Sequence, residues 1–278
     1  MAKLFADIGC LRCWSLISSL FGPKVAYYPG GGSLGTIAAV RRFKKLITSI
    51  VNAAGLEVRR YPTLANAQYA RRRLMEHLRI SLVLDVGANI GQYAQLLYDS
   101  GYRGRCISFE PVAECFAQLR AAAARRGGGW SAEQLALGDA SGSARIHLAG
   151  TMSSLLARSP AASDSITFAD GPTQEITLAT FDSIRERLVP DGQRVWLKMD
   201  VQGYELSVLR GARESLPRIA AIEAEMSLWP FYSSQPLYHE LIDHLDSAGF
   251  DLWSIQPGHR DPQTTRLIEM DGIFVQRC

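Results

Sequence analysis

Leu82-Val83-Leu84-Asp85-Val86-Gly87-Ala88-Asn89-Ile90-Gly91-Gln92-Tyr93 is the stretch of sequence that decides the fold. An apolar run ends in an acid, and a glycine-spaced turn then leads into a helix that should begin near Gln92. This pattern is typical of a nucleotide-type site at the carboxyl end of a central strand in an open α/β sheet. Gly87 and Gly91 are expected to let the backbone turn tightly and leave room for a ligand.

The spacing of the glycines narrows the choice of ligand. A dinucleotide site favours G-x-G-x-x-G and a phosphate-binding loop needs a lysine after its glycines, whereas this turn is G-x-x-x-G without lysine. Asp85 would repel a pyrophosphate but suits a cationic amino-acid head group. Glu110, at the end of the next expected strand, is placed to accept hydrogen bonds from ribose hydroxyls. Together these features indicate S-adenosylmethionine; a plain strand–helix turn is the alternative for the two glycines alone.

The composition suits a globular enzyme. The chain has 278 residues and 47% hydrophobic residues, enough for one large α/β domain and an extension. Its five cysteines are too few and too scattered for a disulfide scaffold, so we expect reduced thiols and a cytoplasmic location. No apolar run approaches the roughly 18 residues that a membrane-spanning helix needs.

Charge is distributed unevenly along the chain. Residues 1–80 carry a net charge of +10 and the remaining residues a net charge of −7, which argues against nucleic acid as the substrate. Apolar residues recur at helical spacing between Ile37 and Ile50, among lysines and arginines. Such a basic amphipathic helix can lie on an anionic membrane surface, here the inner face. The alternative is that its apolar stripe packs on the main domain.

From Ser81 onward, expected strands and helices alternate, which predicts a mainly parallel sheet covered on both faces. Two short alternating segments, 144–149 and 174–178, look like an added hairpin. The polar segment 150–171 between them is expected to cover the site. The last two strands, 250–255 and 271–276, should form a closing antiparallel pair.

The chain resembles the FkbM-type S-adenosylmethionine-dependent O-methyltransferases, and within them a group found in mycobacteria. The resemblance implies a class I methyltransferase (Rossmann-like) domain over residues 80–278. Residues 1–79 are expected, from their charge and helical spacing, to form a basic helical N-terminal extension. The resemblance also implies an acceptor hydroxyl on a sugar, a glycolipid or a related secondary metabolite. Glutamate is the commonest family residue where this chain has Gln202, so a role for charge at that position is doubtful. The matching motifs are LDVGANIGQY (84–93), ISFEPVAECFAQL (107–119), ALGD (136–139), LKMDVQGYELSVLRGA (197–212), IEAEMS (222–227) and DGIFV (271–275).

Methyl transfer to an alcohol requires that the hydroxyl lose its proton, so a general base or a metal is expected. Asp200, at the end of its strand, is the best-placed acid, and Lys198 shares its strand face. Glu225 could meet Asp200 across the site, and the pair would suit Mg²⁺. Alternatively, Asp200 bonds backbone amides and Glu225 pairs with a cation such as Lys198. His259 could reach in as a base from the loop between the last two strands, or be a solvated loop histidine.

Two other functions stay open from the sequence alone: a nicotinamide-dependent oxidoreductase, and a non-catalytic protein that binds the cofactor as a scaffold. For the leading hypothesis, the residues expected to bind S-adenosylmethionine are Asp85, Gly87, Ala88, Asn89, Gly91, Glu110, Pro111, Leu137, Gly138, Asp139 and Ser154.

Overall fold

The computed structural model describes residues 66–157, 159 and 171–277, together with Ser49 and Ala53. The chain divides into two compact units, residues 1–60 and 61–278, and the strands of the described residues lie in the second. The basic segment near Ile37–Ile50 lies outside the described residues apart from Ser49, so its membrane contact stays a prediction. Within the described part of the chain, no helix combines the length and apolar character needed to cross a membrane.

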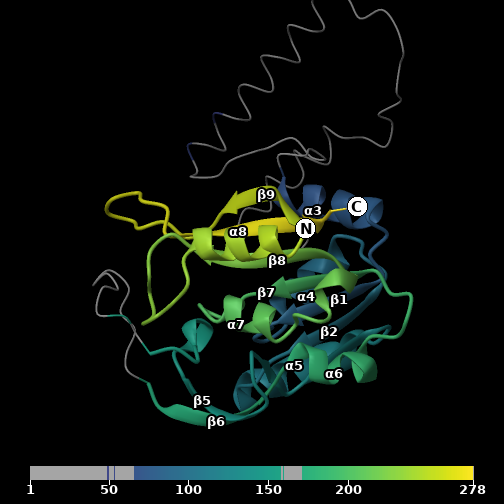
Figure 1. Cartoon of the computed structure of the whole chain (residues 1–278), viewed down its shortest axis with the longest axis horizontal. Helices are drawn as coiled ribbons and strands as arrows, with labels where there is room; N and C mark the ends of the chain where they lie inside the picture. The colour runs from purple at the N-terminus through teal and green to yellow at the C-terminus, as the bar shows by residue number, and fades with distance from the viewer. Residues whose placement is uncertain (1–48, 50–52, 54–65, 158, 160–170, 278) are drawn as a thin grey trace, which may run out of the picture. The chain divides into compact units, whose positions relative to one another are not determined.

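The main sheet of the second unit has seven strands in the order β3-β2-β1-β7-β8-β10-β9 (Figure 1). β10 runs antiparallel to both of its neighbours, while the other adjacent strands pair in parallel. The expected mainly parallel sheet with a closing antiparallel strand is thereby confirmed. The strands are β1 (Leu82–Val86), β2 (Arg105–Phe109), β3 (Trp130–Glu133), β7 (Val195–Met199), β8 (Ile219–Ser227), β9 (Phe250–Pro257) and β10 (Glu269–Gln276).

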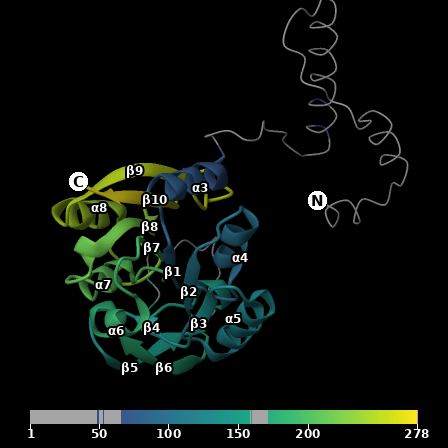
Figure 2. The same cartoon turned by 90° about the vertical axis from the view of Figure 1, so that its right-hand side faces the viewer.

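Helices cover both faces of this sheet, as Figure 2 shows: α3, α4 and α5 on one side, and α6, α7 and α8 on the other. Successive side chains of a strand point to opposite faces, so β1 is buried on both sides. Leu82, Leu84 and Val86 pack with the second group of helices, and Val83 packs with the first. The helices are α3 (Ala67–His77), α4 (Gln92–Asp99), α5 (Ala113–Arg126), α6 (Phe181–Leu188), α7 (Glu205–Arg210) and α8 (Tyr238–Ser247).

A small second sheet stands beside the main one. It contains β4 (Ala136–Leu137), β5 (Gly142–His147) and β6 (Thr173–Ala179), and β5 and β6 pair in antiparallel fashion, which confirms the expected hairpin. The alternation of strands and helices predicts a single strand near residues 131–137, which the structure divides between β3 and β4. Short 3₁₀ turns occupy Gly150–Met152 and Leu216–Arg218.

One helix, α6, was not expected from the sequence. Its start carries a recognisable signal: the side chain of Thr180 caps the helix by accepting a hydrogen bond from the Ser183 backbone N–H. The eight-residue segment then buries Phe181 and Leu188. It was missed because it is short and lies between two strands.

The strand order creates the crevice in which the site lies. The chain runs outward from β1 to β2 and β3, then returns to the other side of β1 through β7. Ligands of open α/β sheets bind at this kind of reversal, outside the carboxyl ends of the strands. The functional site is therefore expected at the carboxyl ends of β1, β2, β7 and β8.

Candidate active site

A cavity of about 460 Å³ opens at the carboxyl ends of these strands. This volume is within the range of pockets that hold a cofactor or small substrate. Lining residues come from the β1 turn and the start of α4, from the ends of β2, β7 and β8, and from β4, β5, the Gly150–Met152 turn, β10 and helix α3. The expected site residues that line it are Gly87, Ala88, Asn89, Glu110, Pro111, Leu137, Lys198, Asp200 and Glu225.

The two glycines of the β1 turn have different structural roles. Gly87 has a φ of +76°, and a Cβ atom there would lie 1.9 Å from the backbone oxygen of Asp200. Gly91 caps α4 with a φ of +92°, and a Cβ atom there would press on Trp130 and Leu119. Gly87 therefore allows the β1 turn to approach the end of β7, while Gly91, which does not line the cavity, allows α4 to pack.

Glu110 is fixed by the backbone around it. One carboxylate oxygen accepts a hydrogen bond from the Asn89 N–H and the other from the Val112 N–H, both at 2.8 Å. A carboxylate can accept about four hydrogen bonds. Glu110 can therefore still accept hydrogen bonds from the hydroxyl groups of a ligand. Burial raises the pKa of Glu110, and the two backbone N–H groups oppose that rise. The expected ribose acceptor is thus held rigidly at the cavity wall.

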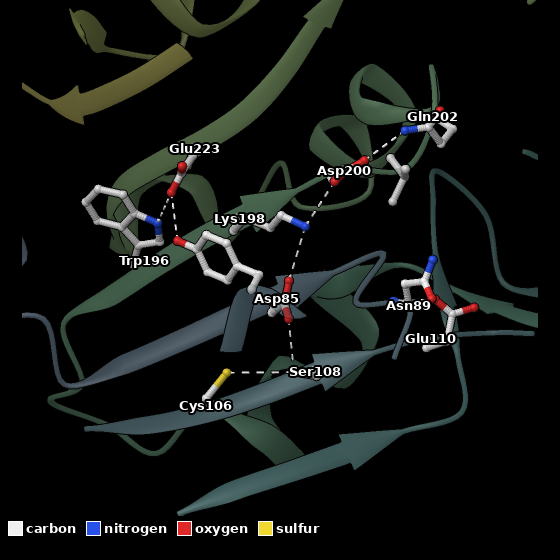
Figure 3. Close-up of polar contacts among 12 residues, drawn as sticks. Asp85, Asn89, Cys106, Ser108, Glu110, Trp196, Lys198, Asp200, Gln202 and Glu223 are labelled. Carbon is white, nitrogen blue, oxygen red and sulfur yellow. Dashed lines mark hydrogen bonds and ion pairs between the residues drawn. The ribbon is translucent and has the colours of Figure 1, made fainter. Parts of the chain in front are cut away.

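A row of polar side chains crosses four strands beside the cavity (Figure 3). In register, Ser108 on β2 pairs with Asp85 on β1, Asp85 with Lys198 on β7, and Lys198 with Glu223 on β8. Residues in register share a face of the sheet. All four side chains consequently lie on the face that carries α3 and α4.

Asp85 lies beneath the cavity and is not among the residues that line it. Its side chain is 0% exposed, accepts a hydrogen bond from Ser108 Oγ at 3.1 Å, and lies 3.3 Å from Lys198 Nζ. Burial raises the pKa of Asp85, and Lys198 and Ser108 oppose that rise. Burial lowers the pKa of Lys198, but the nearby carboxylates of Asp200 and Asp85 outweigh this, so it stays charged. Asp85 is therefore placed to stabilise the charge of Lys198, and not to contact the ammonium group of a ligand directly.

Replacing Asp85 with asparagine should therefore destabilise the protein. Removing one charge of a buried ion pair leaves the other uncompensated, and Asp200 can satisfy Lys198 only in part. We expect the free energy of unfolding to fall by about 2 kcal/mol, measured by urea denaturation. Unchanged stability together with lost cofactor binding would instead place this carboxylate against the ligand.

Glu223 is the centre of a second cluster. Arg71 of α3 forms an ion pair with it, the Tyr93 hydroxyl donates to it at 2.7 Å, and Trp196 Nε1 donates at 3.2 Å. Arg71 and Tyr93 also line the cavity. Neither residue was expected from the sequence to belong to the site. Arg71 is one of three consecutive arginines, and nothing in the sequence distinguishes it from the two beside it.

Asp200 and Glu225 do meet, but a neutral side chain lies between them. Gln202 Nε2 donates to Asp200 Oδ1 at 2.9 Å and to Glu225 Oε2 at 3.1 Å. Lys198 Nζ lies 3.5 Å from Asp200 Oδ2. Nowhere in the described residues do three or more His, Cys, Asp or Glu side chains gather as a metal site would require. The structure gives the expected Mg²⁺ no support.

Further acids line the cavity on the β8 and β10 side. Glu269 and Asp271 alternate on β10 as Glu223 and Glu225 do on β8, and Asp271 is in register with Glu225. Burial and the nearby Asp200 raise the pKa of Glu225 well above its usual value. Burial raises the pKa of Glu269 to about 7 and that of Asp271 to about 6. The alternation of acids at positions 269 and 271 is a sequence signal from which these two residues could have been predicted.

These raised pKa values predict how stability depends on pH. Burial raises the pKa of Glu269 from its ordinary value of 4.5 to about 7, so between these values the folded state keeps a proton that the unfolded state has lost. Raising the pH through this window therefore destabilises the fold. We expect Glu269→Gln to raise the melting temperature at pH 8 and to change it little at pH 4.5. An equal shift at both pH values would show that Glu269 does not titrate in this way.

Besides Asp85 and Gly91, four further expected site residues do not line the cavity. Gly138 is buried against Tyr204, and the exposed Asp139 contacts the hydroxyl of that tyrosine, which does line the cavity. Ser154 is buried and donates to the backbone oxygen of Gln202 at 2.7 Å. His259 is exposed in the β9–β10 connection. The cofactor or base roles given to these residues stay predictions without support from their positions.

Comparison with known proteins decides the family. The profile described as "Methyltransferase FkbM domain" matches residues 85–252, which is more than half of the chain and spans the β1 turn, Glu110, Asp200 and Glu225. The chain belongs to the FkbM methyltransferase family. This FkbM protein is therefore an S-adenosylmethionine-dependent methyltransferase rather than a nicotinamide-dependent oxidoreductase. No curated protein matches its sequence.

Solved structures with similar folds are distant from this FkbM protein. An S-adenosylmethionine-dependent methyltransferase from Mesorhizobium loti is 10% identical, with 76% of this chain and 98% of the other covered and a TM-score of 0.43. Magnesium protoporphyrin IX methyltransferase from Synechocystis, with bound S-adenosylmethionine, is 11% identical, with 97% and 99% covered and a TM-score of 0.41. Similarities this distant do not define a substrate.

Proposed function

We propose that this FkbM protein transfers a methyl group from S-adenosylmethionine to a hydroxyl of a sugar, a glycolipid or a related secondary metabolite. The observation that carries the proposal is the position of Asp200. Its side chain is 42% exposed, it lines the cavity, and it shares that cavity with the glycine turn and Glu110. A carboxylate that is held in place and still accessible suits removal of a proton from an alcohol.

The residues of the β1 and β2 ends fit the cofactor. Gly87, Ala88 and Asn89 of the β1 turn line the cavity, and Glu110 can accept further hydrogen bonds from ribose hydroxyls. Pro111 and Leu137 add apolar surface suited to a base. When bound, S-adenosylmethionine supplies an electrophilic methyl group on a sulfonium sulfur. The acid-lined side of the cavity, near Glu225 and Asp271, is left for the acceptor.

The chain's part in the reaction is to position the acceptor and to receive its proton. Most of the acceleration in such a displacement comes from holding the acceptor oxygen in line with the methyl group. Asp200 accepts the hydroxyl proton on a carboxylate oxygen, and Lys198 and Gln202 hold that carboxylate in position. Sugar hydroxyls can form hydrogen bonds with the neighbouring carboxyl groups of Glu225 and Glu269, which favours a polyhydroxylated acceptor.

An acceptor screen tests the proposal. The full chain would be incubated with S-adenosylmethionine carrying a labelled methyl group and with sugars, glycolipids, amines and carboxylic acids. We expect label on a hydroxyl oxygen of a sugar-containing acceptor, located by mass spectrometry and NMR. Label on nitrogen or carboxylate would refute O-methylation. Tight binding of S-adenosylhomocysteine without turnover of any acceptor would favour the non-catalytic scaffold.

A further inference from the structure

Gln202 adopts a backbone conformation that is uncommon for its residue type. It follows β7 with a φ of +54°, in the left-handed region that residues with a Cβ atom seldom occupy. Ser154 Oγ donates to its backbone oxygen at 2.7 Å, and the Tyr232 hydroxyl lies 3.2 Å from its side-chain oxygen. Ser154 and Tyr232 come from two other segments of the fold. The surrounding structure therefore holds this residue in one orientation.

That orientation directs the amide nitrogen at two acids. Nε2 lies 2.9 Å from an oxygen of Asp200 and 3.1 Å from an oxygen of Glu225. A side-chain amide has two N–H groups, so each carboxylate receives one. Turning the amide over would set its oxygen against two carboxylate oxygens and would take that oxygen away from the Tyr232 hydroxyl. The bonding pattern therefore fixes the assignment of oxygen and nitrogen.

A divalent cation that bridged Asp200 and Glu225 would have to take the place of the Gln202 amide. Mg²⁺ requires oxygen atoms around it at about 2.1 Å, with several carboxylate, carbonyl or water ligands. Here the facing oxygens of Asp200 and Glu225 are bonded to N–H groups, and the nearest cation to Asp200 is Lys198. The residues present therefore do not fit a divalent metal. They fit a pair of acids that is held together by a neutral donor.

We propose that Gln202 is a positioning residue that holds Asp200 and Glu225 together in place of a metal, so that this pair binds no divalent cation. Its effect on methyl transfer rests on the proposed function, because it acts by orienting Asp200 toward the acceptor. The statement about the cation does not rest on that function. Binding of a metal to the purified protein can be measured whether or not an acceptor is known.

The test is a change of one functional group. Gln202→Glu replaces the amide nitrogen with oxygen and places a third carboxylate between Asp200 and Glu225. More charged oxygen ligands tighten the binding of a hard cation, so we expect this variant to bind one equivalent of Mn²⁺ at least about tenfold more tightly than the native protein. Electron paramagnetic resonance of free Mn²⁺ in a titration measures this directly. Gln134→Glu, which adds the same charge at an exposed position outside the cavity, should bind like the native protein.

The native protein supplies the decisive measurement, even if Gln202→Glu fails to fold. We expect no stoichiometric Mn²⁺ binding, and no change in methyl transfer when EDTA is added. Gln202→Met, which lacks the N–H groups, should lower kcat by about tenfold or more and leave the affinity for S-adenosylhomocysteine within about threefold. Native binding of one Mn²⁺ that Asp200→Asn removes would overturn the proposal. Loss of activity in EDTA that Mg²⁺ restores would overturn it as well.

Discussion

Asp200→Asn should reduce methyl transfer by roughly 10²–10⁴-fold, the range found when a positioned general base is removed. Asparagine keeps the size of the side chain and can still meet Lys198 and Gln202 in part, but its amide cannot accept the hydroxyl proton at neutral pH. The loss should appear in kcat. The affinity for S-adenosylhomocysteine, measured by calorimetry, should stay within about threefold because Asp200 is assigned to the acceptor.

Asp191→Asn is the matched control, because Asp191 is almost fully exposed and lies outside the cavity. It makes the same chemical change and should leave turnover and affinity unaltered. Near-native turnover by Asp200→Asn would assign proton removal to another group, with Glu225 the first candidate. A large loss of cofactor affinity would mean that Asp200 contacts the cofactor instead of the acceptor.

Gly87→Ala should both destabilise the fold and impair the site. The new Cβ would lie 1.9 Å from the Asp200 backbone oxygen, so the end of β7 or the β1 turn must move. Overpacking and an unfavourable left-handed backbone together predict a loss of at least about 3 kcal/mol in the free energy of unfolding. Because the atom displaced belongs to Asp200, turnover should fall by roughly 10²-fold in the fraction that folds.

Gly192→Ala separates the effect of the left-handed backbone from the effect of the close contact with Asp200. Gly192 has a φ of +78°, nearly the same as the +76° of Gly87, but a Cβ atom there meets nothing within 4 Å. It should lose only the backbone contribution, about 1 kcal/mol. Equal destabilisation of the two variants in urea would show that close contact with Asp200 adds nothing at Gly87, and would weaken the link between this glycine and the site.

Much of the fold could be predicted from local patterns. The apolar run before Gly87 had to be a buried strand, and the positive φ of Gly87 and Gly91 agrees with the turn expected there. The closing antiparallel strand was also expected, because two alternating segments followed the last helix. Such features depend on residues that are neighbours in the sequence. α6 was missed because it is short and lies between two strands, although Thr180 caps its start.

The contacts of the site were less predictable. Asp85 was expected to face a ligand, yet it lies under Lys198, because β1 and β7 pair in a register that puts the two side chains together. Gln202 was quoted within a motif and given no role, although it connects Asp200 and Glu225. Arg71 was placed in a separate extension, but α3 brings it to Glu223 on β8. Each partner depends on strand register or helix position.

The sequence by itself determined the alternation of strands and helices, the glycine turn, and the acids at the ends of their strands. Backbone conformation and hydrophobic periodicity are local properties, and they can be read from adjacent residues. Only the tertiary structure decided which acids line the cavity. It also decided that Asp85 is buried as the partner of Lys198 and that the Gln202 amide bridges Asp200 and Glu225. Those outcomes arise because pairing in the sheet joins residues more than one hundred positions apart, and burial then determines the charge and the hydrogen bonds that each can keep.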